Sequence, residues 1–176
     1  MLNVKINLGD MVPDSREASQ AAARGIHRLV VRHLRARNMS RPARENGMGH
    51  SNYWSIAADA TRVEGNVVTV SKEGAALHYY GGTVLPRAGK KALAIPKHPK
   101  VSDQNPKEFD PSRTLMRLVW KKGKKAGTLR DAKTGDILYL LVPKAKIHAD
   151  PTVLPDDDKM IDAARAAISD MVECRG

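Results

Sequence analysis

The sequence predicts an α+β protein, with a mainly antiparallel sheet made of β-hairpins, a long amphipathic helix near the N-terminus and another helix at the C-terminus. Residues 2–8 alternate strictly between apolar and polar side chains, which is the period of a half-buried strand. Apolar residues recur every three or four positions over residues 18–34 and again over 160–172, as in amphipathic helices. The chain has 176 residues, of which 41% are hydrophobic, so we expect one domain over residues 1–176.

The first two elements follow from the change of hydrophobic period. Gly9 and Asp10 end the strand. After Pro13, Asp14 and Glu17 have the spacing of a capping box, in which each side chain satisfies a backbone N–H at a helix start. We therefore expect the first helix to begin here and to end at about residue 37.

The middle of the chain alternates between loops and short elements. Residues 38–52 contain proline, glycine and scattered charge without periodicity, and predict an exposed loop whose arginines are candidates for partner contact. A β-hairpin is expected over residues 53–72, with its turn at Gly65-Asn66, although the alanines leave a short helix as the alternative for the first arm. Residues 73–80 predict one or two helical turns, which Gly81 and Gly82 end.

The second half predicts further strands and a long loop. Residues 83–85 and 92–95 are expected to form the two arms of a hairpin with a basic tip at residues 87–91. Residues 97–112 contain three prolines and almost no apolar side chains, which indicates a second exposed loop. Residues 115–120 and 137–142 predict strands of one sheet, joined by hairpin tips or a meander.

The C-terminal helix is predicted after two prolines and an acidic run. Asp156, Asp157 and Asp158 place negative charge at the positive end of this helix. They are also candidates for a contact between subunits, because residues 156–176 carry a net charge of −3 and the preceding 155 residues carry +14. The whole chain carries +11, which fits nucleic acid, acidic proteins, or subunits joined basic face to acidic face.

Basic side chains gather at two predicted turns. They are candidates for contact with a partner or with DNA, because exposed lysine and arginine neutralise phosphates. However, the sequence contains one phenylalanine, where binding of single strands needs aromatic side chains for stacking, and it has no motif of sequence-specific DNA-binding proteins. For these basic side chains, exposure to solvent or contact with another subunit is therefore favoured over DNA binding. The candidates are Arg87, Lys90, Lys91, Lys121, Lys122, Lys124 and Lys125.

Motifs for catalysis, metal binding and cofactor binding are missing from the sequence. Neither Gly89-Lys90 nor Gly123-Lys124 is preceded by the glycine of a phosphate loop, and both lysines are followed by another lysine. The six histidines show no ligand spacing, and the single cysteine, Cys174, stands near the C-terminus. We therefore expect no enzymatic activity, metal or cofactor. An apolar run long enough to span a membrane and a signal-peptide pattern are also missing, so we expect synthesis in the cytoplasm.

The segment from residue 78 to residue 96, HYYGGTVLPRAGKKALAIP, resembles the phage virion-morphogenesis family, the Mu G-like tail-completion and neck proteins. That family carries a similar H-x-x-G-G-T-x-x-P segment followed by K-x-L-x-I-P. Shorter stretches agree in order, so the resemblance covers roughly residues 15–170. The matching residues are His78, Gly81, Gly82, Thr83, Pro86, Leu93, Ile95 and Pro96.

The resemblance implies a structural virion protein without catalytic activity. It implies a small α+β subunit that assembles into a homo-oligomeric ring, a hexamer or a dodecamer, at the head–tail junction or the top of the tail of a phage. The motif residues would be structural, and the partners would be further copies, neighbouring neck and tail proteins and, transiently, DNA in the channel. The alternative from the charge pattern is a DNA-binding accessory protein that uses the basic turns.

Overall fold

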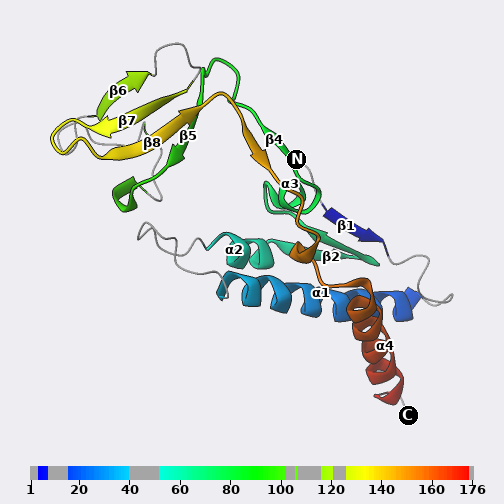
Figure 1. Ribbon diagram of the computed structural model, residues 1–176. Coiled ribbons are helices and arrows are strands. Elements are labelled where there is room, and N and C mark those ends of the chain that lie inside the picture. The colour runs from blue at the N-terminus through cyan, green and yellow to red at the C-terminus, as the bar shows by residue number, and fades with distance from the viewer. Residues whose placement is uncertain are drawn as a thin grey trace. The chain divides into compact units, whose positions relative to one another are not determined.

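The computed structural model describes residues 4–7, 16–39, 52–101, 106, 116–120 and 126–174 and confirms the predicted α+β class (Figure 1). Backbone contacts group the chain into two compact units. The chain leaves the first unit at Gly82 and returns to it at His148, and the second unit contains the intervening segment. The single domain over residues 1–176 stays a prediction.

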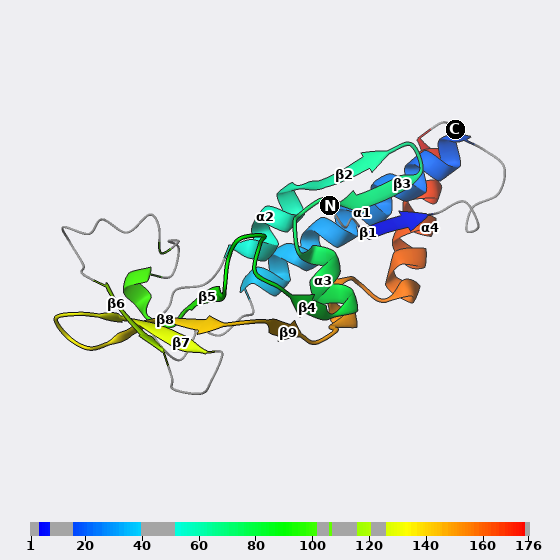
Figure 2. The same ribbon diagram turned by 90° about the horizontal axis from the view of Figure 1, so that it is seen from above.

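In the first unit, a short antiparallel sheet lies along a long helix (Figure 2). The helix is α1 (Arg16–Met39), and the sheet has the order β1-β3-β2, from β1 (Val4–Asn7), β3 (Val67–Val70) and β2 (Thr61–Glu64). The predicted turn at Gly65-Asn66 joins β2 to β3, and Gly65 has a φ of 63°. The core between helix and sheet includes Ile26, Val30, Leu34, Val68 and Val70, all 2% exposed or less.

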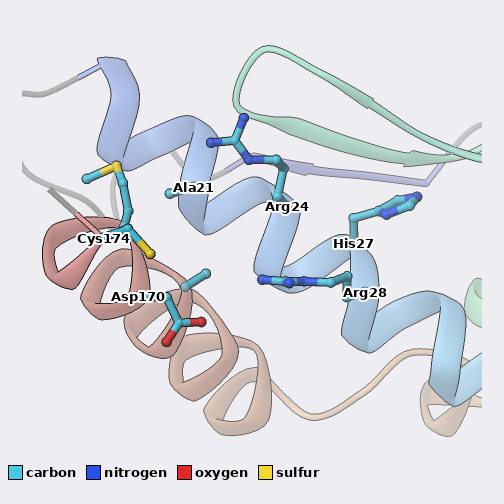
Figure 3. Close-up of a pocket in the computed structure, with 8 residues that line it drawn as sticks. Ala21, Arg24, His27, Arg28, Asp170 and Cys174 are labelled. Carbon is cyan, nitrogen blue, oxygen red and sulfur yellow. The ribbon is translucent and has the colours of Figure 1, made fainter.

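Three further α-helices and a short 3-10 helix, η2 (Pro151–Val153), belong to the described part of the first unit. Helix α2 (Tyr53–Asp59) packs on α1, and α3 (Ala75–Tyr80) contacts η2. The C-terminal helix α4 (Asp157–Glu173) crosses α1 at Gly25 (Figure 3). A Cβ atom added at Gly25 would lie 2.7 Å from the Cβ of Ala167 and against the carbonyl oxygen of Ala163. The absence of a side chain at position 25 therefore lets the two helix backbones approach closely.

The second unit is built on a four-stranded antiparallel sheet of order β5-β8-β7-β6. Its strands are β5 (Leu93–Pro96), β6 (Met116–Trp120), β7 (Gly127–Asp131) and β8 (Ile137–Val142). The last three form the predicted meander. A separate pair joins β4 (Gly82–Val84) to β9 (Ala145–Ile147). Val101 of η1 (Pro99–Val101) packs with Leu138 and Tyr139 in a small buried cluster.

The structure corrects two local predictions. The first arm of the hairpin at residues 53–60 is the helix α2, because Trp54, Ala57 and Ala58 lie on one helical face and are buried in the core with α1. The hairpin predicted over residues 83–95 does not form, since β4 pairs with β9 and β5 pairs with β8.

The remaining predicted elements can be compared only in part. Helix α1 ends at Met39, two residues beyond its predicted end, and η1 occupies part of the loop predicted over residues 97–112. Most of the two predicted loops, 38–52 and 97–112, and the capping residue Asp14 lie outside the described residues.

Candidate functional site

His78, the first motif residue, lies in an aromatic cluster of the first unit. Its ring meets the rings of Tyr53 and Trp54 edge to face, with centroids 5.3 and 5.2 Å apart. Tyr53 and Trp54 also meet edge to face at 4.9 Å. The rings come from α2 and α3, and Trp54 is fully buried. Such pairs stabilise a fold beyond the area they bury, so this contact fixes α3 on α2.

An arginine and an aspartate extend this cluster to the segment that precedes the last helix. The Arg37 guanidinium lies 5.2 Å from the centroid of the Trp54 ring and forms an ion pair with Asp150. It also donates a hydrogen bond to the carbonyl of Thr152 at 3.1 Å. The backbone N–H of Asp150 donates to the carbonyl of His78 at 2.9 Å. Arg37, Tyr53, Trp54, His78 and Asp150, here called the His78 cluster, thus join α1, α2, α3 and the start of η2.

The local electrostatics keep Asp150 ionised. The Thr152 hydroxyl donates a hydrogen bond to its carboxylate at 2.6 Å, and the positive charge of Arg37 lies beside it. These interactions, with the Thr152 hydrogen bond the largest, hold the pKa of Asp150 below its usual 3.8 although partial burial opposes them. The cluster therefore contains an ion pair between Arg37 and Asp150 at neutral pH.

Tyr53 makes the cluster sensitive to alkaline pH. Burial, with a smaller contribution from the charge of Glu73, raises its pKa from 10.0 to about 12. In the unfolded chain the phenol ionises near pH 10, whereas in the folded chain it stays protonated and donates to the carbonyl of Glu73 at 2.8 Å. The stability that Tyr53 contributes should therefore be complete below pH 10 and be lost as pH rises towards 12.

Thermal unfolding between pH 10 and pH 12 tests this assignment. The unfolding temperature should decrease less for Tyr53→Phe than for the wild type, because phenylalanine has no phenol to ionise. Equal decreases would contradict the assignment.

The two motif glycines end α3 and start β4, as predicted. Gly81 has a φ of 74° and Gly82 a φ of 154°, and residues other than glycine rarely adopt these backbone conformations. A Cβ atom at Gly82 would also lie 2.6 Å from Cδ1 of Leu77. The glycines therefore shape the backbone.

The rest of the motif, from Thr83 onward, lies in the second unit. Leu93, Ile95 and Pro96 belong to β5 and are opposite Val142, Leu140 and Tyr139 of β8. Pro86 is half-buried, and Thr83 is exposed in β4. The motif therefore contributes to packing in each unit separately.

One of the two predicted basic turns is described. Arg87, Lys90 and Lys91 are exposed, and the N–H of Lys90 donates to the carbonyl of Arg87 at 2.9 Å, which closes the turn around Gly89. The lysines of the other turn, Lys121, Lys122, Lys124 and Lys125, lie outside the described residues.

The acidic run lies at the start of α4, as predicted. Asp156 pairs with Lys159 at 2.7 Å, and this hydrogen bond and charge lower the pKa of Asp156. Asp157 and Asp158 are exposed in the first helical turn, and neither has an ion-pair partner among the described residues.

The structure also reveals surface features that the sequence patterns did not single out. Leu118 and Trp120 on β6 are 50% and 46% exposed, and Ile137 on β8 is 36% exposed. In the first unit, residues of α1 and α4 line a groove of about 530 Å³ (Figure 3). Arg24, His27 and Arg28 line it from α1, and Asp170 and Cys174 line it from α4. The sequence of β6, MRLVW, does not alternate between apolar and polar residues, so it contains no signal for this exposed face.

Within the described part of the chain, no three histidine, cysteine or acidic side chains are grouped as a metal ion would require. The helices in that part are also too short or too polar to cross a bilayer. None of the protein families, curated proteins and solved structures compared with this chain matches it.

Proposed function

We propose that this chain is a structural subunit of a tailed phage, which assembles into a homo-oligomeric ring at the head–tail neck or the top of the tail. The observation that carries the proposal is the role of the motif residues in packing. His78 packs against Tyr53 and Trp54, and Leu93 and Ile95 lie in β5 of the sheet. A motif used in this way supports an architectural role, in agreement with the resemblance of residues 78–96 to the virion-morphogenesis family.

Exposed apolar side chains of the second unit support assembly. Leu118 and Trp120 lie two residues apart on β6, so their side chains point to the same side of the sheet. Within the described residues, β6 is an edge strand of the sheet. A large tryptophan and a leucine exposed at an edge are features that a neighbouring subunit or a neck or tail protein would cover.

The acidic start of α4 is the proposed contact with the next subunit. In a ring, each subunit presents one surface to the neighbour on one side and a different surface to the neighbour on the other. Asp157 and Asp158 are exposed, while the chain up to residue 155 carries +14, so an acidic contact can meet a basic surface. This contact also explains why acidic charge is concentrated near one end of a basic chain.

Replacing both Asp157 and Asp158 by lysine should weaken assembly, because the contact would then join like charges. Sedimentation velocity should show smaller species for this variant than for the wild type. The matched control is Asp170→Lys with Glu173→Lys, which makes the same charge change at the other end of α4. Circular dichroism checks the fold, since each reversal at the helix start also costs about 0.3–1 kcal/mol of helix stability. Undiminished assembly of the Asp157 and Asp158 variant would contradict the proposed contact.

The second candidate function is a DNA-binding accessory protein. The exposed turn with Arg87, Lys90 and Lys91 favours it, because three cations on a short turn can neutralise neighbouring phosphates. The two functions are compatible if such turns face the channel through which DNA passes.

A further inference from the structure

Three arginines form a row along one face of α1. Arg24, Arg28 and Arg32 are each four residues apart, so their side chains lie on neighbouring turns of the same helix face. With a rise of about 1.5 Å per residue, the row is about 12 Å long. All three side chains are exposed. We refer to Arg24, Arg28 and Arg32 as the arginine row.

The arginine row lacks neutralising partners within the described residues. None of its members has a carboxylate within 4 Å there, whereas Arg35, the next arginine along α1, pairs with Asp59 at 3.0 Å. The nearby acidic group is Asp170 of α4, which lines the same groove as Arg24 and Arg28 without forming an ion pair (Figure 3). His27, also in this groove, lies within 3.3 Å of the carbonyl of Thr61.

Like charges at this spacing destabilise a helix by a few tenths of a kcal/mol per pair, so the row carries a cost that an anionic ligand would remove. Guanidinium groups match phosphate oxygens with two parallel hydrogen bonds and stay charged at any physiological pH. A regular row of guanidiniums therefore fits a ligand that presents several phosphates along a line.

We propose that the arginine row binds the phosphate backbone of duplex DNA without reading its sequence. The acidic helix α4 of a second copy is a poorer complement, because Lys159 and Arg165 lie among its acids and pair with the N-cap Asp156 and with Asp162. A DNA strand, by contrast, presents a phosphate every 3.4 Å without compensating cations. This inference does not depend on the proposed ring, since the row belongs to α1 of a single chain.

The test is the salt dependence of binding to a fluorescent DNA duplex, measured by anisotropy with the full chain. The variant combines Arg24→Gln, Arg28→Gln and Arg32→Gln, which remove the charge but keep unbranched, polar side chains of similar helix propensity. Each phosphate contact contributes about 0.9 to the slope of log affinity against log salt, so this variant should reduce the slope by about 2.7. The matched control removes the same charge through Lys133→Gln, Lys144→Gln and Lys146→Gln, three exposed lysines that belong to neither the arginine row nor the basic turn, and should leave most of the slope. Asp170→Asn should increase the affinity, because a carboxylate beside the row repels phosphate.

Three results would overturn the inference. Failure of the wild-type protein to bind the duplex at low salt would show that duplex DNA is not the ligand of the arginine row. Equal losses in the row variant and in the control variant would indicate a response to net charge alone. Unchanged DNA binding with lost self-association in the row variant would assign the row to a protein partner. Circular dichroism and the thermal unfolding temperature confirm that each variant is folded, so a loss of binding can be attributed to the side chains.

Discussion

Replacing Trp54 by alanine is expected to lower the free energy of unfolding of the first unit by about 3–5 kcal/mol. The indole is fully buried, and it contacts Tyr53, His78 and the guanidinium of Arg37. Alanine would leave a cavity at the point where α1, α2 and α3 meet. It would also remove the ring over which Arg37 lies, and so loosen the connection to Asp150.

The measurement is denaturant unfolding followed by far-ultraviolet circular dichroism. Trp120→Ala is the matched control, because it removes the same side chain from an exposed position on β6. We expect this control to change the free energy of unfolding by much less. Equal effects of the two substitutions would show that Trp54 does not hold the helices together as described.

Replacing Gly25 by leucine is expected to lower the free energy of unfolding by about 3 kcal/mol, because even a Cβ atom at this position meets the backbone of α4. A backbone carbonyl cannot rotate away as a side chain can, so α4 has to move as a whole. Leucine is a better helix former than glycine by somewhat less than 1 kcal/mol, which opposes the loss without cancelling it.

Ala36→Leu provides the control for Gly25→Leu, since Ala36 is exposed on the same helix. It adds the side chain without a neighbour to displace, and the free energy of unfolding should stay nearly constant. Denaturant unfolding measures both variants. A Gly25→Leu protein as stable as the wild type would mean that α4 does not cross α1 at this glycine.

The two long helices could be predicted because their apolar positions follow the helical period over several turns. Helix α2 could not, because Trp54, Ile56 and Ala58 also fit the alternation of a strand. In the structure Ile56 is 48% exposed, while Ala57 is buried beside Trp54. Packing against α1 therefore decides in favour of the helix, and a short local pattern does not contain that information.

The pairing of β4 and β5 is a second case in which local sequence was insufficient. The turn around Gly89 does form, with the Lys90 N–H bonded to the carbonyl of Arg87. The strands on either side nevertheless pair with β9 and β8, which lie far away in the sequence. Turn residues predict where a chain reverses, whereas the partner of each strand depends on non-local pairing.

The His78 cluster was predictable only in part. The motif identified His78 and the two glycines that follow, but not Arg37 or Asp150, which are 113 residues apart and meet through the fold. The arginine row follows from helical spacing once α1 is known, yet its lack of acidic partners requires the structure.

Electron microscopy of the purified full chain, alone and mixed with phage heads and tails, tests the proposed assembly most directly. The account predicts closed rings of uniform diameter, and attachment of these rings to one end of the tail or to the neck of the head. A protein that stays monomeric at high concentration and does not attach to either particle would contradict it.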